Sequence, residues 1–215
     1  GKIYRQRYER GKTVYSLKIV GECEPEKTGT MVTFLPDPEI FEETIFDFGT
    51  LKHRFREIAF LTKGLKIVAR DKREEEEKEV TFHYEGGIKE FVQYLNKSNT
   101  ALYDDILYFE GNKDGVMVEV AMQHNDAYTE NTYGFVNNIT TPEGGTHIVG
   151  FRNALTKTFN EYARKNKLLK ESEQNLTGED IREGLTAIIS VKIEDPQFEG
   201  QTKQKLGNSE ARGAV

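Results

Sequence analysis

Residues 177–193 read TGEDIREGLTAIISVKI, and this stretch decides the fold class. Thr177 with Asp180 three residues later resembles a capping box, which predicts that a short helix begins here. The residues from Leu185 to Ile193 are almost continuously apolar, as is typical of a strand covered on both faces. The stretch therefore predicts a layered fold that contains both helices and strands.

Helices are predicted on both sides of this stretch by the spacing of apolar residues. The longest should begin near Thr141-Pro142 and end near Asn166, because Thr is a good N-cap and Pro is favoured at the first helical position. Its expected buried stripe is Ile148, Phe151, Leu155, Phe159 and Tyr162. Shorter helices are expected over residues 47–62, 88–95 and from about 208 onward.

The strands are predicted by alternating apolar residues between turn signals. A pair over residues 2–20 should turn at Gly11, and a short strand should follow at Met31–Leu35. A charged loop should connect a hairpin of residues 65–70 and 80–84, and Asp114-Gly115 should connect a second. The strands of that second hairpin are expected over 106–110 and 116–122, with a further strand over 132–138.

Composition restricts the class of protein. The chain has 215 residues, 36% hydrophobic and 31% charged, which suits one or two globular domains. No apolar run approaches the roughly 20 residues that span a bilayer, and we expect no signal peptide. The single cysteine, Cys23, excludes an internal disulfide and a thiolate zinc cluster, so a reducing cytoplasm is the expected location. The net charge of -6 argues against a dedicated nucleic-acid-binding surface.

Several segments could carry chemistry, each with a plainer alternative. Residues 195–207 (DPQFEGQTKQKLG) form a polar loop after a buried strand, which could project a lysine onto a phosphate or be an ordinary exposed loop. Gly145-Thr146-His147 could bind an anion at a helix N-terminus or simply connect two elements. Arg152 could line a DNA-holding cavity or lie at a surface or interface. The Thr30 hydroxyl could hold a ligand or cap a turn.

Six stretches in this order resemble the B-subunit family of bacterial DNA gyrase and topoisomerase IV: Tyr84–Ile88, Phe91–Asn96, Asn137–Ile139, Glu143–His147, Gly178–Leu185 and Gln201–Lys203. The resemblance runs essentially the full length. It implies an α+β protein in two parts. Residues 1–80 would be the C-terminal part of an ATPase domain of the gyrase, Hsp90, histidine-kinase and MutL type. Residues 81–215 would be a ribosomal-S5-like transducer domain, truncated at its C-terminal end.

The resemblance also implies a function, which is to couple ATP binding and hydrolysis to DNA strand passage and supercoiling. By similarity, Thr30 helps to hold adenine, Gln201 and Lys203 reach the nucleotide, and Lys203 is the catalytic contact to the γ-phosphate. Arg152 would face the DNA cavity, where we expect weak and salt-sensitive contact. ATP with Mg²⁺ would be required, but the metal-binding residues and the general base of the family lie upstream of Gly1, so the chain alone should be inactive.

The implied partners are DNA, the gyrase A subunit in an A2B2 heterotetramer, and a second B subunit that dimerises when ATP binds, without a membrane. Two other functions are possible. One is a non-catalytic S5-like scaffold, which would have no need of a phosphate-reaching lysine at position 203. The other is a fragment of a MutL-type repair ATPase, against which the long matches at Glu143–His147 and Gly178–Leu185 argue.

Overall fold

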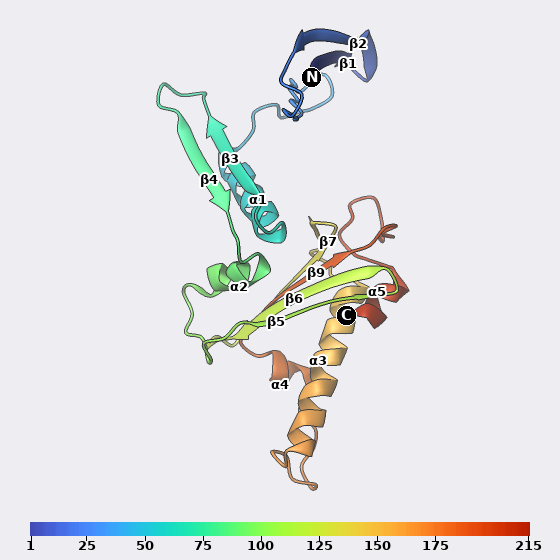
Figure 1. Ribbon diagram of the computed structural model, residues 1–215. Helices are drawn as coiled ribbons and strands as arrows, with labels where there is room; N and C mark the ends of the chain where they lie inside the picture. Colours follow the sequence, from blue (N-terminus) through green and yellow to red (C-terminus); the bar gives the residue numbers. More distant parts are fainter. The chain divides into compact units, whose positions relative to one another are not determined.

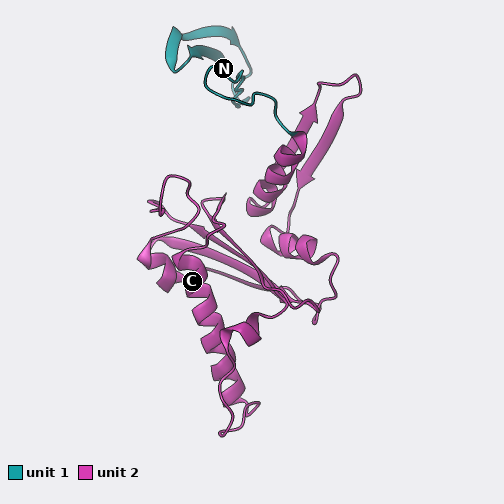
Figure 2. Cartoon of the chain, turned by 180° about the vertical axis from the view of Figure 1, so that it is seen from behind, with its two compact units in different colours: residues 1–47 teal, residues 48–215 magenta.

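The computed structural model describes residues 1–215 and divides into two compact units, residues 1–47 and residues 48–215 (Figure 2). No helix in either unit combines the length and the apolar character needed to cross a membrane. Cys23 is a free thiol.

The first unit is built on an antiparallel hairpin of β1 (Lys2–Glu9) and β2 (Lys12–Glu22). Its two-residue turn has positive φ at both Arg10 (47°) and Gly11 (76°), as a type I′ hairpin turn requires. The strand pair predicted around Gly11 is therefore confirmed. Arg10 also forms ion pairs with Asp37 and Glu39, which attach the following irregular segment to the turn.

The strand predicted at Met31–Leu35 is wrong, because this segment has no regular secondary structure. Met31 is 92% exposed and Leu35 is 91% exposed. A strand requires a partner for its backbone N–H and C=O groups, and the hairpin pairs only with itself. The apolar pattern of these residues was therefore not sufficient to predict a strand. No residue of this unit is buried, so the unit has no core of its own.

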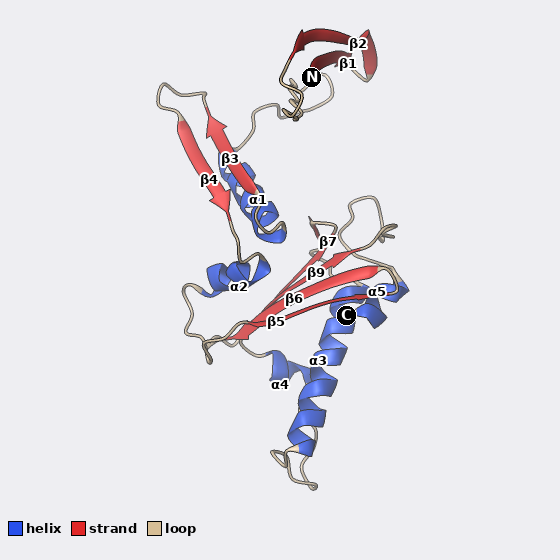
Figure 3. Ribbon diagram, in the orientation of Figure 1, coloured by secondary structure: helices blue, strands red, loops and turns tan.

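The second unit is organised around a five-stranded mixed sheet in the order β5-β6-β9-β7-β8 (Figure 3). Strand β7 runs parallel to β9, and every other neighbouring pair is antiparallel. Strand β9 thus lies at the centre of the sheet. The strands are β5 (Leu107–Lys113), β6 (Val116–His124), β7 (Asn131–Val136), β8 (Ile139–Thr140) and β9 (Leu185–Lys192).

The central strand β9 is buried on both faces, as its continuous apolar sequence predicted. Leu185, Ile189 and Val191 belong to one hydrophobic cluster, whereas Ile188 belongs to another on the opposite face. Successive side chains of a strand point to opposite faces, so a strand between two cores must be apolar at nearly every position. This confirms the interpretation of the stretch that opened the sequence analysis.

Helices cover both faces of the sheet, which confirms the α+β class (Figure 1). One face packs against α3 (Thr146–Lys165), α4 (Gly178–Arg182) and α5 (Ser209–Ala214). The other packs against α2 (Ile88–Asn96) and the C-terminal end of α1 (Phe48–Leu61). Helix α1 also contacts a separate hairpin of β3 (Lys66–Asp71) and β4 (Lys78–His83). The capping box predicted at the start of α4 is present.

Two expectations for the longest helix are wrong. Helix α3 begins at Thr146, five residues after the predicted cap at Thr141. Gly144 (φ 72°) and Gly145 (φ 133°) have left-handed conformations that a right-handed helix cannot contain. The predicted stripe is buried at its start, but Tyr162 is 63% exposed because the helix extends beyond the sheet. The predicted end of the helix at Asn166 is confirmed.

Candidate functional site

The loop that carries the Gln201-Thr202-Lys203 motif is a small hairpin with a firmly held base. Gly207 N–H donates to the Gln197 carbonyl at 2.7 Å, and Glu199 N–H donates to the Lys205 carbonyl at 2.8 Å. The buried Asn208 side chain accepts from Gln197 N–H at 2.6 Å. These bonds restrain both ends of the loop, so its tip is presented on an ordered support.

The same loop is bonded to the turn that precedes α3. Leu206 N–H donates to the Gly144 carbonyl, and Thr146 N–H donates to the Leu206 carbonyl, both at 3.1 Å. Leu206 is buried in the core under α3. The Thr146 N–H is therefore already used, and Gly145-Thr146-His147 holds the loop instead of offering this group to an anion.

The tip of the loop leaves the predicted phosphate contacts exposed. Gln201 and Lys203 are both exposed, and the Lys203 side chain has no hydrogen bond or ion pair within the chain. Lys203 N–H closes a turn onto the Gly200 carbonyl at 3.3 Å, with Lys203 at φ 58°. Lys205 differs, because its ammonium pairs with Glu199 at 3.0 Å. Of these two lysines, only Lys203 has an ammonium group that is not already paired with a carboxylate and can bind an anion.

His147 lies at the start of α3 but is fully buried. Its Nε2 lies 3.1 Å from the Thr141 hydroxyl, and its Nδ1 has no partner. Burial lowers the pKa of His147 to about 4, because a charged imidazolium would lose its hydration there. The side chain therefore serves the fold as a neutral imidazole and offers no positive charge to an anion.

The neutral state of His147 predicts a loss of stability in mild acid. The unfolded chain takes up a proton near pH 6.5, whereas the folded chain resists protonation until about pH 4. The contribution of neutral His147 to the free energy of unfolding is therefore fully present above about pH 6.5 and is lost as the pH falls toward 4. We expect the free energy of unfolding to drop by about 2 kcal/mol between pH 6.5 and 4.5, measured by urea titration with circular dichroism.

Two variants isolate this effect. A His147→Gln variant should start from lower stability but have a flatter pH profile, since its titrating group is gone. A His53→Gln variant should keep the wild-type slope, because the His53 side chain is 73% exposed on α1. An equally steep profile in the His147 variant would exclude His147 as the cause.

Thr30, the residue expected at the adenine, lies in the first unit. It is exposed, in the irregular segment between β2 and α1. Lys203 and Gln201 lie in the second unit. The local geometry of Thr30 gives no ligand pocket of its own.

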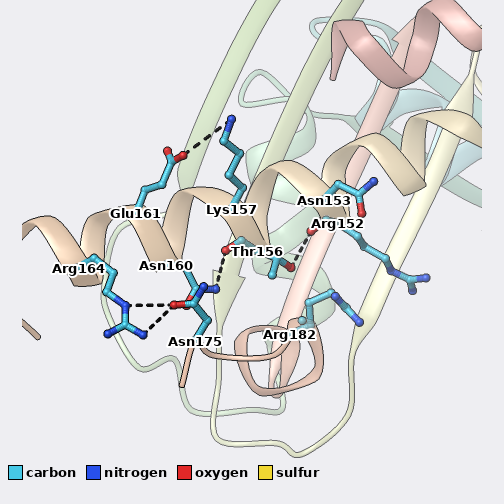
Figure 4. A pocket seen from close by; sticks show the side chains of 10 residues that line it. Arg152, Asn153, Thr156, Lys157, Asn160, Glu161, Arg164, Asn175 and Arg182 are labelled. Atoms are coloured by element: carbon cyan, nitrogen blue, oxygen red, sulfur yellow. Dashed lines mark hydrogen bonds and ion pairs between the residues drawn. The ribbon is translucent and has the colours of Figure 1, made fainter. Parts of the chain in front are cut away.

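Arg152 lines an open pocket of about 840 Å³ where α3 faces α4 (Figure 4). The pocket is formed by successive turns of α3, the segment before α4 and α4 itself. Arg164, Lys157 and Arg182 also line it, so four cationic side chains share one surface. Of these four residues, only Arg152 was predicted from the sequence to have a role.

Arg152 and Arg182 converge on one carboxylate that lies immediately before β7. Arg152 donates from Nε at 2.9 Å and Nη2 at 2.7 Å to Glu130 Oε1, and Arg182 Nε donates to Oε2 at 2.8 Å. The Thr132 hydroxyl donates to the same group at 2.7 Å. Partial burial raises the pKa of Glu130, but the bonds from Thr132, Arg182 and Arg152 outweigh it and lower the pKa overall.

Sequence reasoning missed Glu130 and gave Arg182 no role of its own. Glu130 and Arg182 are 52 residues apart in the chain, and only the pairing of β7 with β9 brings their elements together. Arg182 did lie within the Gly178–Leu185 stretch that carried the family resemblance. No local signal indicated Glu130.

The side chains of this chain do not suit a Mg²⁺ ion. No group of three or more His, Cys, Asp or Glu residues is arranged to hold a metal. Mg²⁺ bound by protein requires carboxylate oxygens that leave room for water and phosphate. Glu199 in the loop and Glu130 beside Arg152 are paired with cations, and Glu161, which lines the pocket, is a single carboxylate 3.8 Å from Lys157.

Comparison with known proteins places these features in one family. The DNA gyrase B family profile matches residues 87–215. The B subunit of DNA gyrase from Bacillus cereus is 57% identical over 213 residues, which cover 99% of this chain and 52% of that protein. The chain thus spans about half the length of this curated relative.

Two solved structures of related proteins are also similar to this chain. The 43K ATPase domain of Thermus thermophilus gyrase B, in complex with an aminocoumarin, matches with a TM-score of 0.84 and 41% identity, over 100% of this chain and 57% of that one. The topoisomerase IV ATP-binding domain of Francisella tularensis matches with a TM-score of 0.80 and 27% identity, over 99% of this chain and 57% of that one. From the profile match and these likenesses together, the chain belongs to the DNA gyrase B family.

Proposed function

We propose that this chain is the ATPase and transducer region of a type IIA DNA topoisomerase, a DNA gyrase, which couples ATP binding and hydrolysis to DNA strand passage and supercoiling. The observation that carries the proposal is the 57% identity to a gyrase B subunit over 99% of the chain. Within this function, residues 1–80 are the C-terminal part of the ATP-binding domain and residues 81–215 are the transducer domain.

The proposed nucleotide contacts are those that the family resemblance implies, and the exposed loop tip is compatible with two of them. Lys203 meets the γ-phosphate of ATP beside Gln201, and Thr30 contributes to the adenine site. The free ammonium of Lys203 and the fixed base of its loop support this role, because a preorganised cation stabilises developing negative charge without first rearranging. Mg²⁺ accompanies ATP, and its ligands lie outside this chain, since the residues here do not suit it.

The same contact can transmit the state of the nucleotide. Lys203 gains its partner only while the terminal phosphate is present, so the loop has different interaction energies before and after hydrolysis. The base of the loop is bonded to Gly144 and Thr146 at the start of α3. A shift of the loop is therefore applied directly to the helix that carries Arg152.

The remaining partners belong to the same proposal. DNA passes along the surface of Arg152, and the protein works with the gyrase A subunit in an A2B2 assembly. A second B subunit joins when ATP binds, in the cytoplasm and away from membranes. The net charge of -6 suits transient DNA contact, because tight binding would oppose passage of the segment.

A chimeric enzyme tests this proposal. This chain replaces the matching 213 residues of the Bacillus cereus gyrase B subunit, and the chimera is combined with the gyrase A subunit of that organism. We expect ATP-dependent supercoiling of relaxed plasmid DNA within about tenfold of the parent enzyme. A chimera that folds and binds the A subunit, yet fails to supercoil DNA, would contradict the proposal.

A further inference from the structure

The surface of α3 that faces α4 has an excess of positive charge, although the chain as a whole has a net charge of -6. Arg152, Lys157, Arg164 and Arg182 line the pocket there, with Glu161 as the single acidic lining residue. Glu161 lies 3.8 Å from Lys157, and both side chains are highly exposed. The three arginines are therefore free of this carboxylate.

The two arginines nearest β7 have the geometry of an anion site. Arg152 and Arg182 place their donors 2.7–2.9 Å from the two oxygens of Glu130. A phosphodiester offers two anionic oxygens with similar spacing, and guanidinium groups bind either anion through paired N–H donors. Glu130 thus lies where a phosphate would be bound.

The exposure of these groups allows exchange. The Arg152 side chain is 44% exposed, whereas Glu130 and Arg182 are 22% and 16% exposed. A phosphate can approach Arg152 from solvent while Thr132 continues to hold Glu130. The Arg152–Glu130 pair is the more exposed of the two, so an incoming phosphate can compete with the carboxylate for Arg152 first.

The site is elongated and suits a polymer. Arg152 and Arg164 are twelve residues apart on α3, a separation of about 18 Å along the helix axis. Phosphates of one DNA strand follow each other at about 3.4 Å along the duplex axis, so several fit this length. Arg164 donates only to uncharged oxygens, those of Asn175 and of the Lys170 and Glu173 backbone, and keeps its full charge.

Starting from the DNA contact of Arg152 in the proposed function, we propose that Arg182 completes the site for a backbone phosphate and that Glu130 is an intramolecular competitor for it. The inference rests on the proposed function, in which DNA passes along this surface. Glu130 keeps the arginines ordered between passages and makes each contact weak, which favours release of the DNA segment. Arg164 extends the site along α3.

Measured DNA affinity tests the competitor directly. The 215-residue chain is titrated onto a fluorescent 20-base-pair duplex at about 50 mM salt, with anisotropy as the signal. Glu130→Gln should bind about fivefold more tightly than the wild type, because the arginines no longer have to leave a carboxylate. Arg152→Gln should bind more weakly than the wild type.

Glu161→Gln is the matched control, because it removes the same charge close to the same arginines without releasing an arginine. It should raise the affinity much less than Glu130→Gln does. In a background of Arg152→Gln with Arg182→Gln, the gain from Glu130→Gln should disappear. The proposal that Glu130 competes with DNA would be wrong if Glu130→Gln and Glu161→Gln raised the DNA affinity equally. It would also be wrong if Glu130→Gln still raised the affinity when both arginines had been replaced.

The outcomes separate this inference from the function on which it rests. If Arg152→Gln weakens DNA binding but Glu130→Gln changes nothing, the DNA contact stands and the competitor is wrong. If neither variant changes binding, both the DNA contact of Arg152 and the inference fail, whereas the supercoiling assay of the chimera still tests the function. If millimolar inorganic phosphate displaces the duplex completely, the site takes small anions and the DNA assignment is wrong.

A measurement on the wild type avoids any effect of substitution on folding. The side-chain Nε–H signals of Arg152 and Arg182 are followed by NMR while the duplex is added. Both signals should shift, and the Nε–H signal of Arg70, which pairs with Glu79 on the β3–β4 hairpin, should remain unchanged. Unchanged signals of Arg152 and Arg182 at saturating DNA would contradict the site.

Discussion

Replacement of Lys203 by alanine in the full-length protein is expected to leave ATP binding in place and to lower ATP turnover by about a hundredfold or more. The ammonium is free at the tip of a loop whose base is fixed by Gly207 and Asn208. Its removal therefore deletes a phosphate contact without disturbing the core. Turnover is measured by a coupled assay and binding by calorimetry with a non-hydrolysable ATP analogue.

Lys205→Ala provides the control for the same loop. The Lys205 ammonium pairs with Glu199 at 3.0 Å, and both side chains are substantially exposed, so this pair contributes little to stability. Turnover of the Lys205 variant should stay within about twofold of the wild type. Near-normal turnover of the Lys203 variant would sink the catalytic role, and would favour the scaffold function, which needs no lysine at this position.

Gly145→Ala should lower the free energy of unfolding of the second unit by about 3 kcal/mol or more. Gly145 has φ 133°, which L-residues with a side chain rarely adopt. An added Cβ would lie 2.8 Å from Leu206 Cα and closer still to the Leu206 backbone N and O. The clash falls on backbone, which cannot rotate away, so the bonds between the loop and the start of α3 must break.

Two readouts distinguish local damage from general loss of structure. Urea titration gives the free energy of unfolding, and amide exchange at Leu206 reports the bond to the Gly144 carbonyl. Gly213→Ala is the control, since a Cβ there meets nothing within 4 Å and α5 should gain slightly from it. Unchanged protection of the Leu206 amide in the Gly145 variant would show that the hydrogen bonds between the loop and the start of α3 do not depend on this glycine.

The hydrogen bonds between the loop and the start of α3 have a functional consequence within the proposed mechanism. The Gly145 variant and the Lys203 variant should differ in kind. Loss of Lys203 removes a contact to the phosphate, whereas loss of the Gly145–Leu206 pairing leaves the lysine present but poorly positioned. Loss of Lys203 should reduce turnover at unchanged substrate affinity. The Gly145 variant displaces Gln201 together with Lys203, so it should also weaken binding of the nucleotide.

The sequence was most informative where a pattern had a local cause. The turn at Gly11, the capping box of Thr177 and the end of α3 at Asn166 depend on neighbouring residues and were predicted correctly. The double-faced burial of β9 was also visible, because a strand between two cores is apolar at almost every position. Local patterns of this kind fix which elements form.

The sequence failed where the partner was distant. Met31–Leu35 has a strand-like composition, but no strand of its unit pairs with it. Thr141-Pro142 has the composition of a helix start, yet the Thr141 hydroxyl lies beside His147 and the helix begins later. In the first case the strand has no partner for its backbone groups, and in the second the fold uses the segment in another way, so both outcomes depend on residues outside the local pattern.

The sequence by itself determined the α+β class, most of the elements, the family, and the candidate residues Thr30, Arg152, Gln201 and Lys203. Only the tertiary structure decided how the second unit arranges its candidates. The Lys203 loop is tied to the start of α3, and Arg152 meets Arg182 at Glu130. These contacts join residues 22 to 62 positions apart, and pairing at such distances follows from the topology of the fold and not from any local pattern.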